Sequence, residues 1–406
     1  MPDTAKDRLY FDHNATAPLL PAAREAWLQT HDLYWHNPSS PYKPAAKARA
    51  LLEASRADLA ALLGADDPER LLFVSGASEG NNTVIHYYAQ QQQVSSPTLI
   101  TSTIEHASLN EAIALHWQGA VEKLPVNPDG CLEIHALEER LARHDLPKPT
   151  LVSIMAANNE TGVLQPWQAC ADLCCRHAVP FHCDASQWLG RLPLSELGKC
   201  AWLTASAHKC GGPRGIGLLL RPHKNCGGPL IAGGGQERGQ RGGTEDLPAI
   251  RAMIAAIGEC PTDEQRQRLA AARDDFESTI CSTITNTIVL GKSAPRLWNT
   301  SALILPMREQ QTWLSGLERF GILASTGSAC AGHSLGTGGS HVPLAMGFDR
   351  AQARRMLRFS GNAQTTTADW QRLSEALLAL HQQWQKESDP SSDSDALTRI
   401  IDISDY

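Results

Sequence analysis

The chain contains 406 residues, of which 42% are hydrophobic and 19% are charged. These ordinary values exclude a wholly disordered chain and a fibrous repeat, and the length predicts one large domain with a smaller one beside it. The formal net charge of -7 and the lack of a long run of lysine and arginine argue against nucleic acid as a partner.

The first residues are polar, and no apolar stretch approaches the roughly 20 residues that span a bilayer. We therefore expect a cytoplasmic protein that does not contact a membrane. The eleven cysteines of such a chain are expected to be reduced thiols, and most of them to be buried.

The densest group of potential metal ligands comprises Cys170, Cys174, Cys175, His177, His182 and Cys183. Structural zinc sites usually take their ligands from two short paired loops, whereas adjacent cysteines on a helix point about 100° apart. We therefore expect no metal site in this group.

Helical periodicity runs from residue 22 to 63 and is interrupted by a proline-rich loop at 36–41. After it, short apolar runs alternate with amphipathic stretches; the runs cover residues 71–74, 98–100, 150–154, 179–183 and 215–220. Strands that alternate with helices predict an α/β domain with a mainly parallel central sheet.

The pattern changes near Gly258 to a long charged helix at 263–276, followed by strands near 288–290 and 302–305 and by a closing helix at 368–385. These elements predict a smaller α+β domain. The expected division is an N-terminal segment that packs with the small domain (1–17), a large domain (18–260), a small C-terminal domain (261–386) and an acidic flexible tail (387–406).

The ends of the apolar runs carry the polar residues of interest, beginning with the segment Ser75 to Asn82. It precedes a helical stretch, and the free N–H groups of a helix start together with the Ser78 hydroxyl suit a phosphate group. An ordinary capped helix start contains the same residue types, so this segment alone leaves both interpretations open.

His106 follows the next run, and Asn158 follows the one after it. An imidazole at this edge of a sheet can stack on a planar cofactor, although a structural histidine is the alternative, and the asparagine offers amide donors and acceptors. Asp184 follows the run at 179–183 and either keeps a pyridine nitrogen protonated or caps a helix. Gln187, three residues later, can reach a substituent of the same ring.

Lys209 lies in a polar, glycine-flanked turn at 206–213. Burial or neighbouring positive charge lowers the pKa of a lysine and makes its amine a nucleophile for imine chemistry, and Ser206 and His208 are suited to hold a phosphate. A solvated surface lysine is the alternative for this turn alone. Because all these groups follow successive strands of one sheet, together they predict a pyridoxal phosphate pocket.

The chain resembles the cysteine desulfurases of the class V aminotransferase group from Tyr10 to about Thr366. The matching segments are residues 10–16, 37–40, 75–82, 105–106, 158–162, 206–209, 233–238 and 243–245. The resemblance implies the fold type I of pyridoxal phosphate-dependent transferases, which has a large domain with a mainly parallel central sheet and a smaller α+β C-terminal domain. The chain departs from the usual pattern at Tyr42, Ala45, Ala46, Gly242 and Asn362, none of which is a catalytic position.

The resemblance also implies a role for each matching residue. Lys209 would bind pyridoxal 5'-phosphate as an imine, His106 would stack on its ring, Asp184 would pair with the ring nitrogen, and Gln187 would contact the ring hydroxyl. The phosphate would be held by the backbone of Ala77 and by Ser78, Ser206 and His208. Thr244 would reach the phosphate of the neighbouring subunit, which implies a homodimer, and Asn158 and Arg358 would bind the substrate carboxylate.

Cys330 lies among small residues at 325–334, a setting that leaves a thiol accessible. The resemblance implies that its thiolate attacks the sulfur of L-cysteine after Lys209 has removed the Cα proton, with His106 as a candidate proton donor. The products would be L-alanine and a persulfide on Cys330, which passes its sulfur to an acceptor protein for iron–sulfur cluster assembly, tRNA thiolation or another pathway.

Two alternatives remain open from the sequence. The residues around Ala329 and Cys330 are also reminiscent of selenocysteine lyases, which release selenide and alanine. The other alternative is a non-catalytic scaffold that binds pyridoxal phosphate and docks a sulfur-carrier protein.

Overall fold

The computed structural model describes residues 8–91, 97–327 and 339–387. Its centre is a seven-stranded sheet in the order β2-β8-β7-β6-β5-β3-β4. The strands are β2 (Leu71–Val74), β3 (Thr98–Ser102), β4 (Ala120–Leu124), β5 (Leu151–Ser153), β6 (Phe181–Asp184), β7 (Trp202–Ser206) and β8 (Gly217–Leu220). The expected α/β class with a mainly parallel central sheet is confirmed.

Strand β8 is antiparallel to both of its neighbours. It follows β7 after a short connection that holds the 3₁₀ turn Ala207–Lys209. A parallel return to the same sheet needs a crossover of about a dozen residues or more, so this connection brings the chain back in the opposite direction. As a consequence, the turn that carries Lys209 is pinned between two paired strands.

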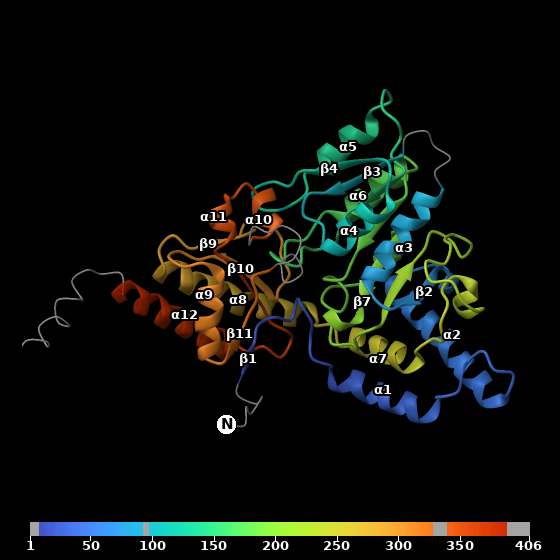
Figure 1. Cartoon of the computed structure of the whole chain (residues 1–406). Helices are drawn as coiled ribbons and strands as arrows, with labels where there is room; N and C mark the ends of the chain where they lie inside the picture. Colours follow the sequence, from blue (N-terminus) through green and yellow to red (C-terminus); the bar gives the residue numbers. More distant parts are fainter. Residues whose placement is uncertain (1–7, 92–96, 328–338, 388–406) are drawn as a thin grey trace, which may run out of the picture.

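Helices cover both faces of the sheet (Figure 1). The helices of this part are α1 (Pro21–Leu33), α2 (Lys43–Leu63), α3 (Ala77–Gln90), α4 (Ala107–His116), α5 (Ile134–Ala142), α6 (Trp167–Arg176) and α7 (Leu247–Gly258). Side chains alternate along β2: Leu71 and Phe73 pack into one core with residues of α2, α5, α6 and α7, whereas Leu72 and Val74 pack into another with residues of α3 and α4. Burial of both faces explains why the strands are continuous apolar runs in the sequence.

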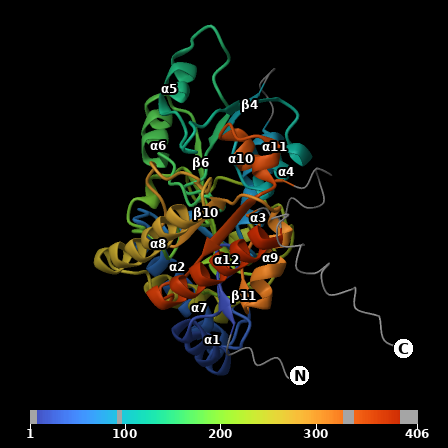
Figure 2. The same cartoon turned by 90° about the vertical axis from the view of Figure 1, so that its left-hand side faces the viewer.

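The C-terminal part has its own core around an antiparallel sheet in the order β12-β10-β9. The strands are β9 (Ile288–Val289), β10 (Thr300–Ile304) and β12 (Met356–Ser360), and the helices are α8 (Asp263–Thr283), α9 (Gln310–Arg319), α10 (His341–Ala345), α11 (Arg350–Ala353) and α12 (Thr367–Glu387). Helices α8, α9 and α12 lie toward the viewer in Figure 2. Helix α8 continues seven residues past the predicted end at 276, because Ile280 is still buried in this core.

The N-terminal segment crosses between the two parts. Strand β1 (Leu9–Tyr10) pairs in parallel with β11 (Ile322–Leu323), and buried Phe11 packs against Trp370 with ring centroids 4.7 Å apart. The chain then passes the turn after β7, where the Ala17 N–H donates to the His208 carbonyl, and enters α1 (Figure 1). The boundaries of the expected domains stay a prediction, and the tail at 388–406 lies outside the described residues.

Among the helices of the described ranges, none combines the length and the apolar character that a membrane crossing requires. Within the same ranges, no group of three or more His, Cys, Asp or Glu side chains is arranged to hold a metal ion.

Candidate active site

The Lys209 side chain lies against the N-terminal segment. Its Nζ donates to the main-chain carbonyls of Asn14 at 2.9 Å and Ala15 at 2.8 Å. The neighbouring His208 makes a 3.2 Å contact from Nδ1 to the hydroxyl of Thr16, and its carbonyl accepts from the Ala17 N–H. Lys209 is thus half-buried and oriented by main-chain groups, so the interpretation as a freely solvated surface lysine does not describe this turn.

Asp184 is the last residue of β6 and is buried. One carboxylate oxygen accepts from the Asn81 side-chain amide at 2.9 Å, and the other accepts from the Ser186 N–H at 3.0 Å. Turns follow in place of an α-helix, so Asp184 does not cap a helix. A buried carboxylate with only neutral donors around it is suited to pair with a cationic ring nitrogen.

His106 is the N-cap residue of α4. Its Nδ1 accepts from the Ser108 N–H at 3.1 Å and lies 2.9 Å from the Ser108 hydroxyl. Burial lowers the pKa of His106; the charge of Asp184 opposes this effect, and the positive charges of Lys209, His341 and Arg358 add to it. Three residues that the sequence assigned to the same pocket, Asp184, Lys209 and Arg358, thus lie close enough to affect the pKa of His106.

The start of α3 lies beside the end of β7. The N–H of Ala77, the first residue of α3, donates to the Ser206 hydroxyl at 2.7 Å, and Ser78 in the same turn is exposed. Burial, with smaller contributions from Lys209 and two arginines, lowers the pKa of His208 to about 4. A neutral imidazole, two hydroxyls and a helix start together provide hydrogen-bond donors for a phosphate.

Gln187 is buried, and its Nε2 donates to the Asn14 carbonyl at 3.0 Å. Its Oε1 is buried without a hydrogen-bond partner among the described residues. A buried acceptor without a donor costs free energy, so this atom fits the hydroxyl of a bound ring.

Arg358 projects from β12 and is buried. It donates to Asp12 at 2.5 Å and to the carbonyls of Asn159 at 2.9 Å and Gly327 at 3.2 Å. Its Nε is buried without a partner in the described part of the chain and is therefore available to a carboxylate ligand.

Asn158 is also fully buried, but its amide is engaged by the protein. Its Oδ1 accepts from the N–H groups of Glu160 and Thr161, and its Nδ2 donates to the Ile104 carbonyl. The turn that these bonds stabilise presents the Asn159 carbonyl to Arg358. Asn158 thus helps to orient Arg358, the other residue that was expected to bind the substrate carboxylate.

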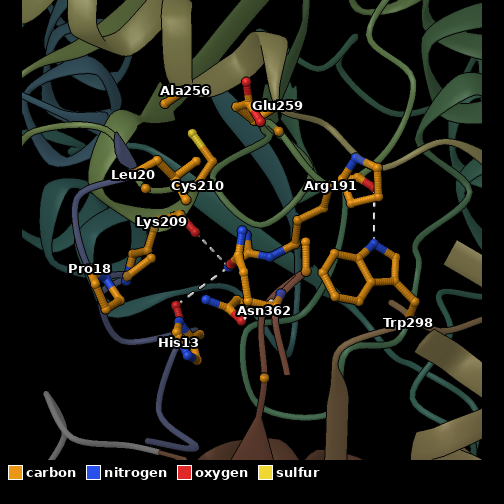
Figure 3. Close-up of a pocket in the computed structure, with 17 residues that line it drawn as sticks. His13, Pro18, Leu20, Arg191, Lys209, Cys210, Ala256, Glu259, Trp298 and Asn362 are labelled. Atoms are coloured by element: carbon orange, nitrogen blue, oxygen red, sulfur yellow. Dashed lines mark hydrogen bonds between the residues drawn. The ribbon is translucent and has the colours of Figure 1, made fainter. Parts of the chain in front are cut away.

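Arg191 is a residue of this region that sequence reasoning missed. Its guanidinium donates to the carbonyls of Gln187 and Lys209, at 3.2 and 2.8 Å, and contacts the carbonyl of His13 at 3.5 Å. Figure 3 shows it between His13 and Lys209, in a pocket that Cys210, Asn362 and Trp298 also line. Because most of its partners are main-chain carbonyls, the sequence carried no signal of this role.

The remaining predicted residues lie apart from these groups or outside the described ranges. Thr244 is exposed on the single chain, in the segment after the 3₁₀ turn Gln236–Gly239. Cys330 lies outside the described residues. Asp184, His106 and Lys209 lie at or just after the carboxyl ends of β6, β3 and β7, and Ser206 at the end of β7 contacts the start of α3. Arg358 of β12 lies close enough to affect the pKa of His106.

A family model for class-V aminotransferases matches residues 9–373. The chain belongs to this family. A cysteine desulfurase of Cereibacter sphaeroides is 38% identical over 381 residues, which cover 91% of this chain and 95% of the relative. The family assignment that the sequence motifs predicted is therefore confirmed, and it extends to the cysteine desulfurases within the family.

Solved structures agree with this assignment. A NifS-like protein superposes with a TM-score of 0.81 at 29% identity and covers 92% of this chain and 99% of its own. The structure of SspA in complex with cysteine gives a TM-score of 0.76 at 29% identity and covers 88% of this chain and all of the other. Both structures match most of the length of this chain.

Proposed function

We propose that this protein is a pyridoxal phosphate-dependent cysteine desulfurase that converts L-cysteine to L-alanine and collects the sulfur as a persulfide on Cys330. The arrangement that carries the proposal is the placement of Asp184, His106 and Lys209 at or just after the ends of β6, β3 and β7 of one sheet. Arg358 of β12 lies close enough to act on the charge of His106. The cysteine desulfurase relatives, which span almost the whole chain, support the same activity.

The residues present fit the cofactor. The unpartnered Oε1 of Gln187 suits a ring hydroxyl, Asp184 suits a protonated ring nitrogen, and the start of α3 with Ser78, Ser206 and His208 suits a phosphate. When bound, pyridoxal phosphate supplies an aldehyde that captures an amine and a ring that accepts electrons from Cα.

Lys209 is the residue assigned to hold the cofactor and to remove the Cα proton of the substrate. Its contacts to the Asn14 and Ala15 carbonyls keep the amine at the end of β7. Arg358 is assigned to the substrate carboxylate, and its anchoring by Asp12 and two carbonyls places it in one orientation for that task. Asn158 contributes by stabilising the turn that contacts Arg358.

Cys330 is assigned to the sulfur transfer on the basis of its sequence setting and of the family. Its thiolate would form an S–S bond with the substrate sulfur while the Cα-bearing fragment keeps the electrons of the broken C–S bond and is protonated to alanine. Gly327, three residues before Cys330, accepts a hydrogen bond from Arg358, so this segment leaves the described structure beside the proposed carboxylate site.

The decisive test combines spectroscopy with product analysis. Purified protein should show an absorbance band near the visible edge that Lys209→Ala removes, and it should form alanine and release sulfide from cysteine in the presence of a thiol reductant. Absence of both would contradict the proposed function, whereas the absorbance band without alanine or sulfide would favour the scaffold alternative. The variant Cys330→Ala distinguishes a cysteine desulfurase from a selenocysteine lyase. A desulfurase loses turnover of cysteine, whereas a selenocysteine lyase retains turnover of selenocysteine.

We also propose a homodimer in which Thr244 of each subunit reaches the other subunit's phosphate site. Thr244 is exposed, and large apolar side chains on and after α1 are exposed as well: Trp27, Leu28, Leu33, Trp35 and Tyr42. Such a group of exposed apolar side chains supports association. Mixing inactive Lys209→Ala subunits with weakened Thr244→Ala subunits should restore activity, because one site of each mixed dimer then has both residues; an additive result would contradict shared sites.

The sulfur acceptor is proposed to be a protein thiol. A cytoplasmic location is proposed as well, since the cysteines of the described residues are all unpaired. Affinity capture with the persulfidated enzyme, compared with Cys330→Ala, tests the acceptor: a partner retained by both forms would not be receiving sulfur from Cys330.

A further inference from the structure

A continuous row of hydrogen bonds links Asp184, assigned to the ring nitrogen of the cofactor, to His106, assigned to stack on the ring. Asn81, on the first turns of α3, donates to Asp184 at 2.9 Å and to the Ser108 hydroxyl at 3.0 Å. The Ser108 hydroxyl in turn lies 2.9 Å from Nδ1 of His106. Asn81 is fully buried and Asp184 is 7% exposed, so solvent does not replace these bonds.

The orientation of the Asn81 amide follows from its partners. Its Oδ1 accepts from the Thr204 hydroxyl at 2.6 Å, and its Nδ2 faces the Asp184 carboxylate. A flipped amide would place its oxygen against a carboxylate oxygen, which offers no hydrogen to share. The NH₂ group therefore points toward Asp184 and Ser108.

The hydrogen bonds that lead to Asn81 from Ser153, through His182 and Thr204, all donate in the direction of Asn81. Burial lowers the pKa of His182 to about 4, so its imidazole is neutral at pH 7. The Thr204 hydroxyl donates its only hydrogen to Asn81, so it must accept from Nε2 of His182, 3.1 Å away. Nδ1 of His182 then has no hydrogen and accepts from the Ser153 hydroxyl at 2.7 Å. Each group in this series therefore donates to the next, and the last hydrogen bond is accepted by the Asp184 carboxylate.

On the other side of Asn81, the hydrogen bonds of Ser108 determine which ring nitrogen of His106 carries the hydrogen. Ser108 accepts at its oxygen from Asn81, so its own hydrogen is free to point to Nδ1 of His106, which already accepts from the Ser108 N–H. A ring nitrogen that accepts two hydrogen bonds carries no hydrogen, and a neutral imidazole then carries it on the other nitrogen.

We propose that Asn81 and Ser108 are positioning residues that connect Asp184 to His106 and hold the His106 imidazole in the tautomer with its hydrogen on Nε2. His106 then offers a hydrogen-bond donor, and not an acceptor, to whatever lies against Nε2. The use of this donor toward the cofactor or the substrate rests on the proposed function, whereas the tautomer itself does not.

The glycine before Asn81 is part of this arrangement. A Cβ added at Gly80 would lie 2.6 Å from Cγ2 of Thr204, so the helix approaches β7 this closely only with a hydrogen in that place. The close approach brings Asn81 within reach of Thr204 and Asp184 at once.

The test is the ¹⁵N spectrum of histidine-labelled protein, recorded with and without pyridoxal phosphate and assigned by comparison with His106→Asn. Wild type should show Nδ1 of His106 unprotonated and Nε2 protonated. In Asn81→Asp the new side chain shares one proton with Asp184, since two charged carboxylates cannot lie this close. The Ser108 hydrogen turns to its other oxygen, and the Nδ1-protonated form should become on the order of fivefold more populated, the effect of one neutral hydrogen bond. Ser108→Ala should shift the ratio in the same direction, and less, because alanine offers no oxygen to accept from a protonated Nδ1.

Two variants guard this test against a general loss of structure. Asn82→Asp lies one residue along α3, where the amide contacts the Ser78 carbonyl and His116, and it should keep the wild-type ratio. Ser108→Thr keeps the hydroxyl and should do the same.

A wild-type His106 with its hydrogen on Nδ1, or wild-type ratios in both Asn81→Asp and Ser108→Ala, would overturn the proposal. Failure of the proposed function is a separate outcome, because it would appear as missing cofactor absorbance and missing alanine while the tautomer of His106 is still measured.

Discussion

At the scale of single residues, the cations of the candidate active site are held largely by main-chain carbonyls. Lys209 contacts the Asn14 and Ala15 carbonyls, Arg191 contacts those of Gln187 and Lys209, and Arg358 contacts those of Asn159 and Gly327. Carbonyls orient a charged side chain without neutralising it, so these groups keep their attraction for anionic ligands. Asp12 is the exception, since its carboxylate pairs with Arg358.

Arg358 is the residue whose removal should act most directly on substrate binding. Arg358→Ala should lower kcat/KM for cysteine roughly 10- to 150-fold, because a hydrogen bond to a charged group contributes about 1.5–3 kcal/mol. Steady-state alanine formation measures this effect. Arg358→Lys should recover part of it, since the charge remains and the paired donors do not. A folded Arg358→Ala protein with unchanged kcat/KM would show that the carboxylate binds elsewhere.

At the scale of elements, the site depends on how closely α3 packs on β7 and β8. The motif at 75–82 predicted a helix start from its small residues, and the structure shows that α3 begins at Ala77. The sequence did not reveal that Gly80 lies directly against Thr204, because a contact across 124 positions leaves no local pattern. The same limit applies to β8, whose apolar run was predicted although its antiparallel direction was not.

Gly80→Ala tests this close packing. The added methyl would meet Cγ2 of Thr204 at 2.6 Å, so we expect a loss of about 1–3 kcal/mol in the free energy of unfolding and weaker retention of the cofactor. Gly258→Ala is the matched control at the end of α7, where an added Cβ meets no atom within 4 Å. It should be neutral or stabilising by about 0.5–1 kcal/mol. Equal unfolding midpoints in urea for the two variants would contradict the packing argument.

A second element-scale feature is the buried ion pair between Arg56 of α2 and Glu237. The guanidinium donates to both carboxylate oxygens at 2.8 and 2.9 Å, and Glu237 also accepts from the Phe73 N–H. Glu237 and Arg238 both have positive φ, at 45° and 56°, so this turn needs outside support. The turn lies a few residues before Thr244, which was proposed to reach the phosphate site of the other subunit. The ion pair therefore stabilises the segment that carries Thr244.

Removal of one partner should be costly. Arg56→Ala leaves Glu237 charged and buried, and we expect a loss of about 3–5 kcal/mol in the free energy of unfolding. Arg251→Ala is the control, since Arg251 pairs with exposed Asp58 and such pairs contribute about 0–1 kcal/mol. Chemical denaturation of the two variants measures the difference, and a loss below 1 kcal/mol in Arg56→Ala would show that the pair is dispensable.

At the scale of the whole molecule, one segment joins the C-terminal part to the active site. Residues 9–15 pair with β11 through β1, contact Arg358 through Asp12, and hold Lys209 through the Asn14 and Ala15 carbonyls. The motif at 10–16 was recognised in the sequence only as a resemblance, because it holds Lys209 through backbone carbonyls and its Asp12 side chain pairs with an arginine 346 positions away. Side-chain chemistry predicted Asp184, His106 and Lys209, whereas the carbonyl network required coordinates.

Buried titratable groups should make the stability of the molecule depend on pH. Burial raises the pKa of Glu105 from its ordinary value of 4.5 to about 8, so the folded chain keeps a proton that the unfolded chain has lost. The free energy of unfolding therefore falls as the pH rises through this range, by about 1.4 kcal/mol per pH unit for one such group. His13, His182 and His208 act in the opposite direction below pH 6.5, because burial lowers the pKa of each to about 4.

The effect of Glu105 should consequently be clearest between pH 7 and 8, above the range of the histidines and of Glu160, whose pKa burial raises to about 7. Glu105→Gln keeps an acceptor for the Ser102 hydroxyl and the Met155 N–H but cannot ionise. Its free energy of unfolding should therefore fall less between pH 7 and 8 than that of wild type, and should be higher than that of wild type at pH 8. Urea unfolding at a series of pH values measures both slopes, with exposed Glu138→Gln as the control. Parallel curves for Glu105→Gln and wild type would mean that Glu105 is already ionised in the folded protein.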